Sequence, residues 1–146
     1  MEERTLAVLL DEILPPSADG RMPGAGRLGL ARSLDATLAQ APDMRDQVRR
    51  SLTTLDASSQ RRAGVDFAAL APELRSELLN ELEAQQPGFQ GTLAFFIYTL
   101  YYQHPRVLEG LGLEGRPPFP KGYEVQPFDE SLLDAVRRRP KMYRPV

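Results

Sequence analysis

The segment FQGTLAFFIYTLYYQHPRVLEGLGLEGRPPFPKGY, residues Phe89–Tyr123, decides the fold of this chain. Its first half is a run of apolar and aromatic side chains from Leu93 to Tyr102, interrupted only by Thr99. A helix that is apolar around nearly its whole circumference is typical of a buried element. We therefore predict a helix over residues 89–103 and expect the rest of the chain to pack around it.

This helix is expected to end at a corner formed by His104 and Pro105. Proline disfavours helical geometry in the residue before it, so His104 falls between two helices. A short helix is predicted over residues 105–109, with Gly110 at its C-cap. We interpret His104, the one histidine of the chain, as a side chain that caps or packs at this corner.

Leucines at helical spacing predict further helices on the amino-terminal side of this segment. Two of these helices are expected to start at prolines suited to a first helical position, Pro42 and Pro72. The polar residues Asp56–Ser59 are expected to end or bend one helix, and a short element with Phe67 follows. The predicted helices cover residues 5–14, residues 27–40, residues 42 to about 56, and residues 72 to about 85.

No segment shows the period-two alternation of a strand. The predicted fold class is all-α: a compact bundle of about five or six short helices with a Pro-rich irregular C-terminal arm. After Gly112, the last 34 residues hold six of the 13 prolines and carry a formal charge of +2, from seven basic and five acidic residues. We predict a helical domain over residues 1–123 and an arm over residues 124–146 that packs on the domain or on a partner. In the arm, Asp129 is expected to cap a short helix over residues 130–138.

Composition and length exclude several functional classes. The chain of 146 residues has no cysteine, which excludes disulfides, thiolate metal sites and a cysteine nucleophile. Its formal charge of −2 gives no field that favours nucleic acid, and its longest apolar run is about half of the ~20 residues that span a bilayer. The amino terminus has no secretory pattern, so we expect a cytoplasmic location as the sequence stands, or a periplasmic one if a signal was trimmed or a partner carries it.

Three motifs that can carry chemistry are interpreted structurally. The letters of Gly24–Gly29 match G-x-G-x-x-G, but no hydrophobic strand precedes them, so we predict a turn that leads into the second helix. Glu73, Glu77 and Glu81 share one helix face without the Glu-x-x-His pairs of a di-metal bundle, and a solvated face is predicted. The run Arg137–Arg139 is interpreted as a contact for an acidic surface or as a stabiliser of its own helix end. We predict no catalytic residue, no metal ligand and no cofactor-binding residue in this chain.

The aromatic helix allows two interpretations. It is either a core helix or a helix that shares one face with another protein, because Tyr and Phe are favoured at the centres of interfaces. The loop of residues 116–123 and the arm carry further aromatic anchors that would be costly to leave in water. The candidates for a partner interface are Tyr98, Tyr101, Tyr102, His104, Arg116, Phe119, Tyr123, Phe128 and Tyr143.

The order and spacing of short motifs over roughly residues 5–123 resemble the gluconate 2-dehydrogenase subunit 3 family. The motifs that carry this resemblance are Ile13-Leu14-Pro15, Asp19, Pro23-Gly24-Ala25, Phe67 before a leucine helix, Phe89, Tyr101-Tyr102, Pro105-Arg106-Val107, Leu111-Gly112, and Pro118 to Gly122-Tyr123. The residues after Tyr123 lie outside the resemblance.

The resemblance implies a small helical subunit that accompanies a large FAD-containing catalytic subunit of the glucose–methanol–choline oxidoreductase type. In some such complexes a multi-haem cytochrome takes the electrons. The small subunit is similar to a chaperone, since it supports maturation of the large subunit and often carries a twin-arginine export signal, which this sequence lacks. It has no catalytic residues, so the resemblance implies a non-catalytic accessory subunit with FAD in its partner, no nucleic acid and no direct membrane insertion.

Two alternatives stay open at this point. One is a stand-alone helical module that binds a small apolar or sugar-like ligand in a pocket beneath Tyr98, Tyr102 and His104. The other is a small hydrolase that uses His104, although the sequence shows no nucleophile elbow.

Overall fold

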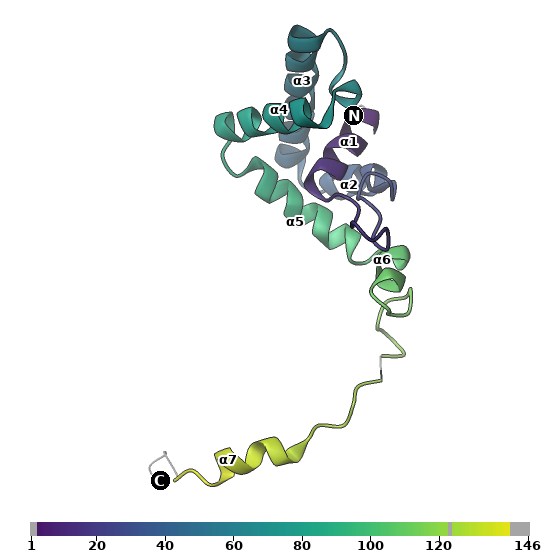
Figure 1. Cartoon of the computed structure of the whole chain (residues 1–146), viewed down its shortest axis with the longest axis vertical. Helices are drawn as coiled ribbons and strands as arrows, with labels where there is room; N and C mark the ends of the chain where they lie inside the picture. Colours follow the sequence, from purple (N-terminus) through teal and green to yellow (C-terminus); the bar gives the residue numbers. More distant parts are fainter. Residues whose placement is uncertain (1–2, 123, 141–146) are drawn as a thin grey trace. The chain divides into compact units, whose positions relative to one another are not determined.

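The structure is a computed structural model that describes residues 3–122 and 124–140. Within these residues all regular structure is helical, seven α-helices and two 3-10 helices, and the predicted all-α class is confirmed. The chain divides into two compact units, residues 1–116 and residues 117–146, whereas the sequence suggested a boundary after Tyr123. The ribbon of each unit can be followed by its colour in Figure 1.

The helices of the first unit follow one another with short connections, except for the long loop of residues 14–29 between α1 and α2 (Figure 1). They are α1 (Glu3–Ile13), α2 (Leu30–Leu38), α3 (Pro42–Ala63), the 3-10 helix η1 (Phe67–Ala69), α4 (Pro72–Gln85), α5 (Phe89–Tyr101) and α6 (Pro105–Gly110). Three of them begin at a proline, as predicted, because the missing amide of proline is not needed in the first turn. The second unit holds a 3-10 turn, η2 (Glu130–Leu133), followed directly by α7 (Asp134–Arg137).

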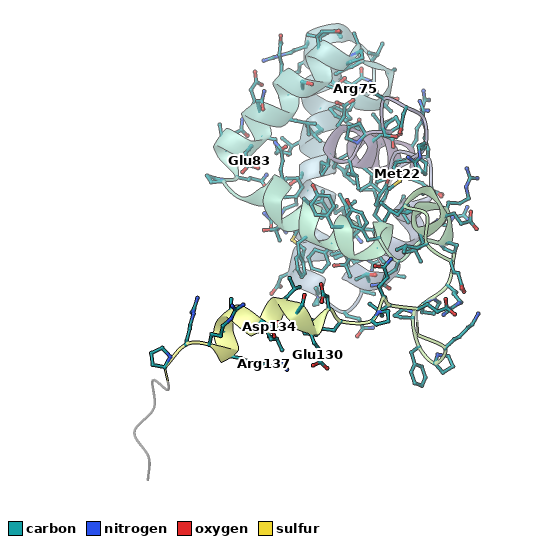
Figure 2. All side chains as sticks on the ribbon, turned by 60° about the horizontal axis from the view of Figure 1, so that its bottom comes forward. Met22, Arg75, Glu83, Glu130, Asp134 and Arg137 are labelled. Carbon is teal, nitrogen blue, oxygen red and sulfur yellow. The ribbon has the colours of Figure 1, made fainter. Side chains whose placement is uncertain are left out.

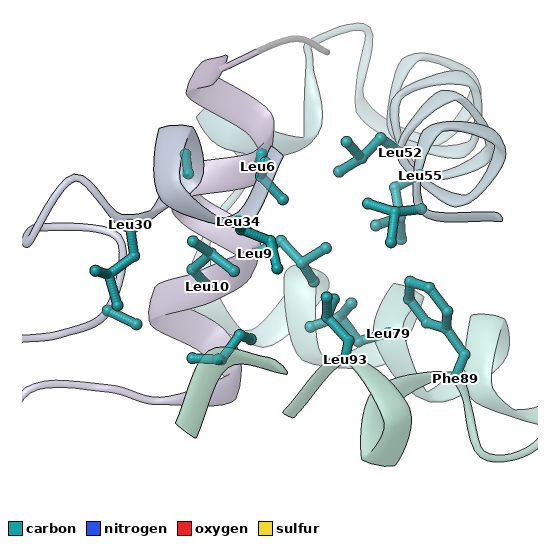
Figure 3. Packing of buried hydrophobic residues seen from close by; sticks show 14 of the residues in the cluster. Leu6, Leu9, Leu10, Leu30, Leu34, Leu52, Leu55, Leu79, Phe89 and Leu93 are labelled. Atoms are coloured by element: carbon teal, nitrogen blue, oxygen red, sulfur yellow. The ribbon is translucent and has the colours of Figure 1, made fainter. Parts of the chain in front are cut away.

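The core of the first unit is built around α1, which contacts α2, α3, α5 and η1. Figure 3 shows its leucines Leu6, Leu9 and Leu10 among side chains from α2, α3, α4 and α5. Leu9 and Leu10 are fully buried, and each buried leucine stabilises the fold by about 1.5–3 kcal/mol relative to an exposed one. The core is therefore mainly aliphatic around α1, with the rings of Phe67, Phe89 and Tyr101 also buried in it, and α5 forms one of its walls.

Helix α3 differs from the prediction, since it continues without a break through Asp56–Ser59 to Ala63. The carboxylate of Asp56 accepts hydrogen bonds from the Thr5 hydroxyl at 3.2 Å and from the Phe67 amide at 3.0 Å. The buried Ser59 hydroxyl donates to the carbonyl of Val65 at 2.6 Å. These polar side chains bond to neighbouring elements and do not compete with the helical backbone, so the predicted end of the helix at this point was wrong.

The glycine-rich segment of residues 24–29 is a turn, as predicted, and it packs closely on α1. The Gly26 amide donates to Asp11 Oδ1 at 2.8 Å. A Cβ atom on Gly26 would lie 1.9 Å from the Ala7 carbonyl oxygen, and one on Gly24 would lie 2.2 Å from Asp11 Oδ1. Gly24 and Gly26 thus allow the loop to approach α1 closely, because a side chain at either position would clash with this helix. Helix α2 begins only after this turn, at Leu30.

The corner between α5 and α6 is built as expected around His104. Its backbone is extended, with φ −75° and ψ 130°, and its Nδ1 accepts a hydrogen bond from the Arg106 amide at 3.2 Å. The predicted C-cap role of Gly110 was wrong, because α6 includes Gly110 and the left-handed residue that follows is Gly112, with φ +79°. A Cβ atom on Gly110 would lie 2.8 Å from the sulfur of Met22, so this glycine allows the loop before α2 to approach α6.

The three glutamates of α4 are exposed, as predicted. Arg62 of α3 forms ion pairs with Glu77, at 3.5 Å, and with Glu81. These side chains are about half exposed, so each pair contributes little to stability, typically about 0–1 kcal/mol. The acidic face of α4 is therefore a solvated face that is loosely tied to α3.

Candidate partner-binding surface

Helix α5 is held at its amino-terminal end by the preceding helix. The carboxylate of Glu83 on α4 accepts hydrogen bonds from the amides of Gly88, at 2.6 Å, and Gln90, at 2.9 Å. Figure 2 labels Glu83 at this position on α4. A carboxylate at a helix amino terminus satisfies free amides and interacts favourably with the helix dipole. The start and direction of α5 are thus fixed by α4.

One side of α5 is buried. Phe89, Leu93, Ile97 and Tyr101 recur every four residues, and all four lie in the core. The Tyr101 ring is 2% exposed, and its hydroxyl donates to the Pro23 carbonyl at 2.8 Å. Burial, and secondarily the neighbouring Tyr102, raises the pKa of Tyr101. Tyr101 was a predicted interface candidate, but the fold places it in the core of the chain itself.

The opposite side of α5 carries an aromatic face, defined here as Phe95, Tyr98 and Tyr102. These residues have spacings of three and four, so they share one side of the helix, and they are 69%, 45% and 50% exposed. The rings of Tyr98 and Tyr102 lie 6.1 Å apart between centroids. Phe95 was not among the predicted interface residues, although its spacing from Tyr98 and Tyr102 gives the signal that would have found it.

Two further predicted interface residues, Arg116 and Phe119, follow α6 in the sequence. The Arg116 guanidinium is ion-paired with Glu114, and its side chain is partly buried. Phe119, in the second unit, is exposed. Tyr123 and Tyr143, two further predicted interface residues, lie outside the described residues.

The second unit consists of exposed residues throughout its described part, residues 117–122 and 124–140. Its apolar side chains include Val125 and Phe128 in the extended stretch before the helical turns. The Asp129 carboxylate accepts a hydrogen bond from the Ser131 amide at 3.0 Å, which confirms the predicted cap. The hydrogen bonds from Ser131 also lower the pKa of Asp129. The arm therefore presents apolar side chains from a locally organised segment.

Three clefts among the described residues lie away from these side chains. The largest of these three has a volume of about 380 Å³, and another has a volume of about 90 Å³. The largest is lined by Val8, Asp11, Glu12, Pro15, Pro16, Arg27 and Arg75. In it the Arg75 Nε and Glu12 Oε1 atoms are 2.8 Å apart, in an ion pair that joins α4 to α1. None of the three is lined by Tyr98, Tyr102 or His104, so the ligand-pocket alternative gains no support from them.

The described part of the chain contains no cluster of three or more His, Cys, Asp or Glu side chains arranged to hold a metal ion. In the same residues, every helix is too short or too polar to cross a membrane. Nδ1 of His104 is engaged by the Arg106 amide, and the Tyr101 hydroxyl by Pro23. What the arrangement offers is an apolar and aromatic surface suited to binding another protein.

Comparison with curated proteins and with solved structures gave no significant match. The family described as gluconate 2-dehydrogenase subunit 3 matches residues 1–112. The matched residues include helices α1 to α6 and every residue of the hydrophobic core, whereas the arm follows the match. The chain therefore belongs to the gluconate 2-dehydrogenase subunit 3 family, a family of small subunits of dehydrogenase complexes.

Proposed function

We propose that this chain is a non-catalytic accessory subunit of a heteromeric FAD-dependent sugar or polyol dehydrogenase. In this proposal the large subunit is a flavoprotein of the glucose–methanol–choline type, and it holds both the FAD and the catalytic residues. The small subunit supports the folding, stability or maturation of the large one. A cytochrome subunit would be an additional partner, which copurification would reveal.

The observation that carries this proposal is the aromatic face of α5. Its three rings belong to a helix whose opposite side is packed in the core. Binding a partner through these rings therefore restricts few additional side chains, and the loss of conformational entropy is small. Complete burial of one such apolar side chain contributes about 1.5–3 kcal/mol. Tyrosine in addition offers a hydroxyl, which explains its enrichment among residues that dominate binding energy.

The composition of α5 also supports a protein partner. Its sequence, FQGTLAFFIYTLY, contains no charged residue, although the chain as a whole is 26% charged. Depletion of charge is the feature that distinguishes the centre of an interface from ordinary protein surface. A helix with one side in the core and an uncharged aromatic second side is therefore well suited to lie between its own domain and a second protein.

The first test is expression of the large subunit with and without this chain. We expect the large subunit alone to be insoluble or poor in flavin, because an apolar surface that normally contacts the small subunit is left in water. The flavin absorbance per soluble large subunit measures the effect. A large subunit that folds, holds FAD and turns over normally alone would refute the accessory role.

The second test is the double variant Phe95→Ser and Tyr98→Ser. It removes two exposed rings, so the stability of the free chain should change little, whereas affinity for the large subunit should fall about 10- to 100-fold. Val65→Thr is the matched control, since Val65 is also an exposed apolar residue but lies in the loop between α3 and η1. Equal affinity of both variants would place the interface away from the aromatic face.

A further inference from the structure

The arm contains a helical segment whose charges are arranged to stabilise it locally. We call residues Glu130–Arg137, formed by η2 and α7, the arm helix. Asp129 caps its amino terminus, Glu130 lies in its first turn and Arg137 in its last, which matches the sign of the helix dipole at both ends. Arg137 also forms ion pairs with Glu130, at 3.3 Å, and Asp134, at 3.8 Å. A helix this short has marginal stability in isolation. The cap and the ion pairs therefore favour its formation before the arm binds a partner.

The arm helix also has an apolar side. Leu132, Leu133 and Val136 are exposed, and neither η2 nor α7 has a buried residue. Figure 2 labels Glu130, Asp134 and Arg137, and Arg137 pairs with each of the two carboxylates. Leu132 and Val136, four positions apart, lie on the other side of the helix, whereas Leu133 follows Glu130 by three positions and shares its side. Within its own unit the apolar side has no cover.

The features of the arm favour a partner over a second copy of the chain. The family match ends at residue 112, so the arm helix is outside the part that the family shares. A second copy would offer the aromatic face of α5 as its apolar surface, and the proposed function already assigns that face to the large subunit. Arg138 and Arg139, which follow the helix directly, favour carboxylates beside the site that receives it.

From these observations we infer that the arm helix docks its Leu132 and Val136 side into an apolar groove of the large subunit, which has acidic side chains near the carboxyl end of the helix. This inference rests on the proposed function and adds a second contact to the aromatic face. A helix that is already formed loses less conformational entropy when it binds. Two contacts on one chain, joined by the proline-rich stretch of residues 117–128, make the binding bivalent, and this raises affinity by about 10²- to 10⁴-fold where both sites are within reach.

The absence of cysteine from the chain allows a direct test. Val136→Cys introduces one thiol on the apolar side, and Ser131→Cys introduces a matched thiol away from it without removing the Ser131 amide that Asp129 caps. Each full-length variant is coexpressed with the large subunit, and its reaction with a maleimide is followed by the mass of this chain. We expect the thiol at position 136 to react at least about 10-fold more slowly in the complex than in the free chain, and the thiol at position 131 to react at similar rates in both.

A binding measurement complements the thiol test. Leu132→Asp together with Val136→Asp should raise the dissociation rate of the complex about 10²- to 10⁴-fold, while the melting temperature of the free chain stays the same, because the arm contributes no residue to the core. Arg138→Gln and Arg139→Gln should weaken the complex less, and most at low salt.

The outcomes separate this inference from the proposed function. A complex that assembles while the thiol at position 136 reacts as in the free chain overturns the docking of the arm and leaves the accessory role intact. Failure to form any complex overturns both. Protection of that thiol in the free chain also overturns the inference: protection that rises with protein concentration identifies a second copy as the occupant, and protection independent of concentration identifies the chain's own first unit.

Discussion

At the scale of single residues, the adjacent tyrosines Tyr101 and Tyr102 have opposite environments. The ring of Tyr101 is in the core and its hydroxyl reaches Pro23, which is 78 positions away in sequence, whereas Tyr102 is half exposed. Their rings touch edge to face, with centroids 5.3 Å apart. The buried tyrosine thus fixes the loop before α2, and its neighbour is available for a partner.

Tyr101→Phe is expected to lower the free energy of unfolding by about 1–2 kcal/mol, because the carbonyl of Pro23 then loses its buried donor. Urea denaturation measures this difference. Tyr102→Phe is the control, and it should leave stability unchanged within about 0.5 kcal/mol. Equal stabilities of the two variants would show that the hydrogen bond to Pro23 contributes nothing.

The raised pKa of Tyr101 predicts a loss of stability in alkali. The neutral phenol is favoured in the folded state, so its contribution is complete below the ordinary pKa of 10.0 and is lost as the pH rises through the higher pKa of the folded state. The melting temperature of the natural chain should therefore fall more steeply above pH 10 than that of Tyr101→Phe. Parallel curves for the two proteins would contradict this assignment.

At the scale of elements, the glycine turn and α1 depend on close contact. A Cβ atom at Gly26 would lie 1.9 Å from a backbone oxygen of α1, which cannot move without disturbing the helix. We expect Gly26→Ala to cost about 1–3 kcal/mol of unfolding free energy. Gly91→Ala, in α5, meets open space and should stabilise the chain by up to about 1 kcal/mol, because alanine is the better helix former. Chemical denaturation of both variants tests the contrast, and a tolerated Gly26→Ala would rule out this packing.

At the scale of the whole molecule, the two units have different roles in stability. All residues of the hydrophobic core lie in the first unit, and the last of them is Val107. Ending the chain after Arg116 should therefore shift the melting temperature by less than about 3 °C, which corresponds to less than about 1 kcal/mol. Differential scanning calorimetry of the two chains is the measurement, and a larger drop would mean that the arm supports the core.

Much of the fold could be predicted from the sequence because it depends on local chemistry. Pro42, Pro72 and Pro105 begin their helices, since proline preorganises a first turn. The same local logic placed His104 at a corner and Asp129 at a cap, and both are confirmed. The candidate surface was predicted less well, because the sequence alone does not say which side of a nearly all-apolar helix faces inward.

The sequence by itself determined the helices, most of their starts, the corner at His104 and the membership of a family of dehydrogenase subunits. Only the tertiary structure decided that Tyr101 faces the core and that the side of α5 with Tyr98 and Tyr102 is exposed. It also decided that α3 runs on past Asp56, whose partner Thr5 is 51 positions away. The physical reason is the same in each case: helix formation is set by neighbours along the chain, whereas burial and side-chain hydrogen bonding are set by residues that only folding brings together.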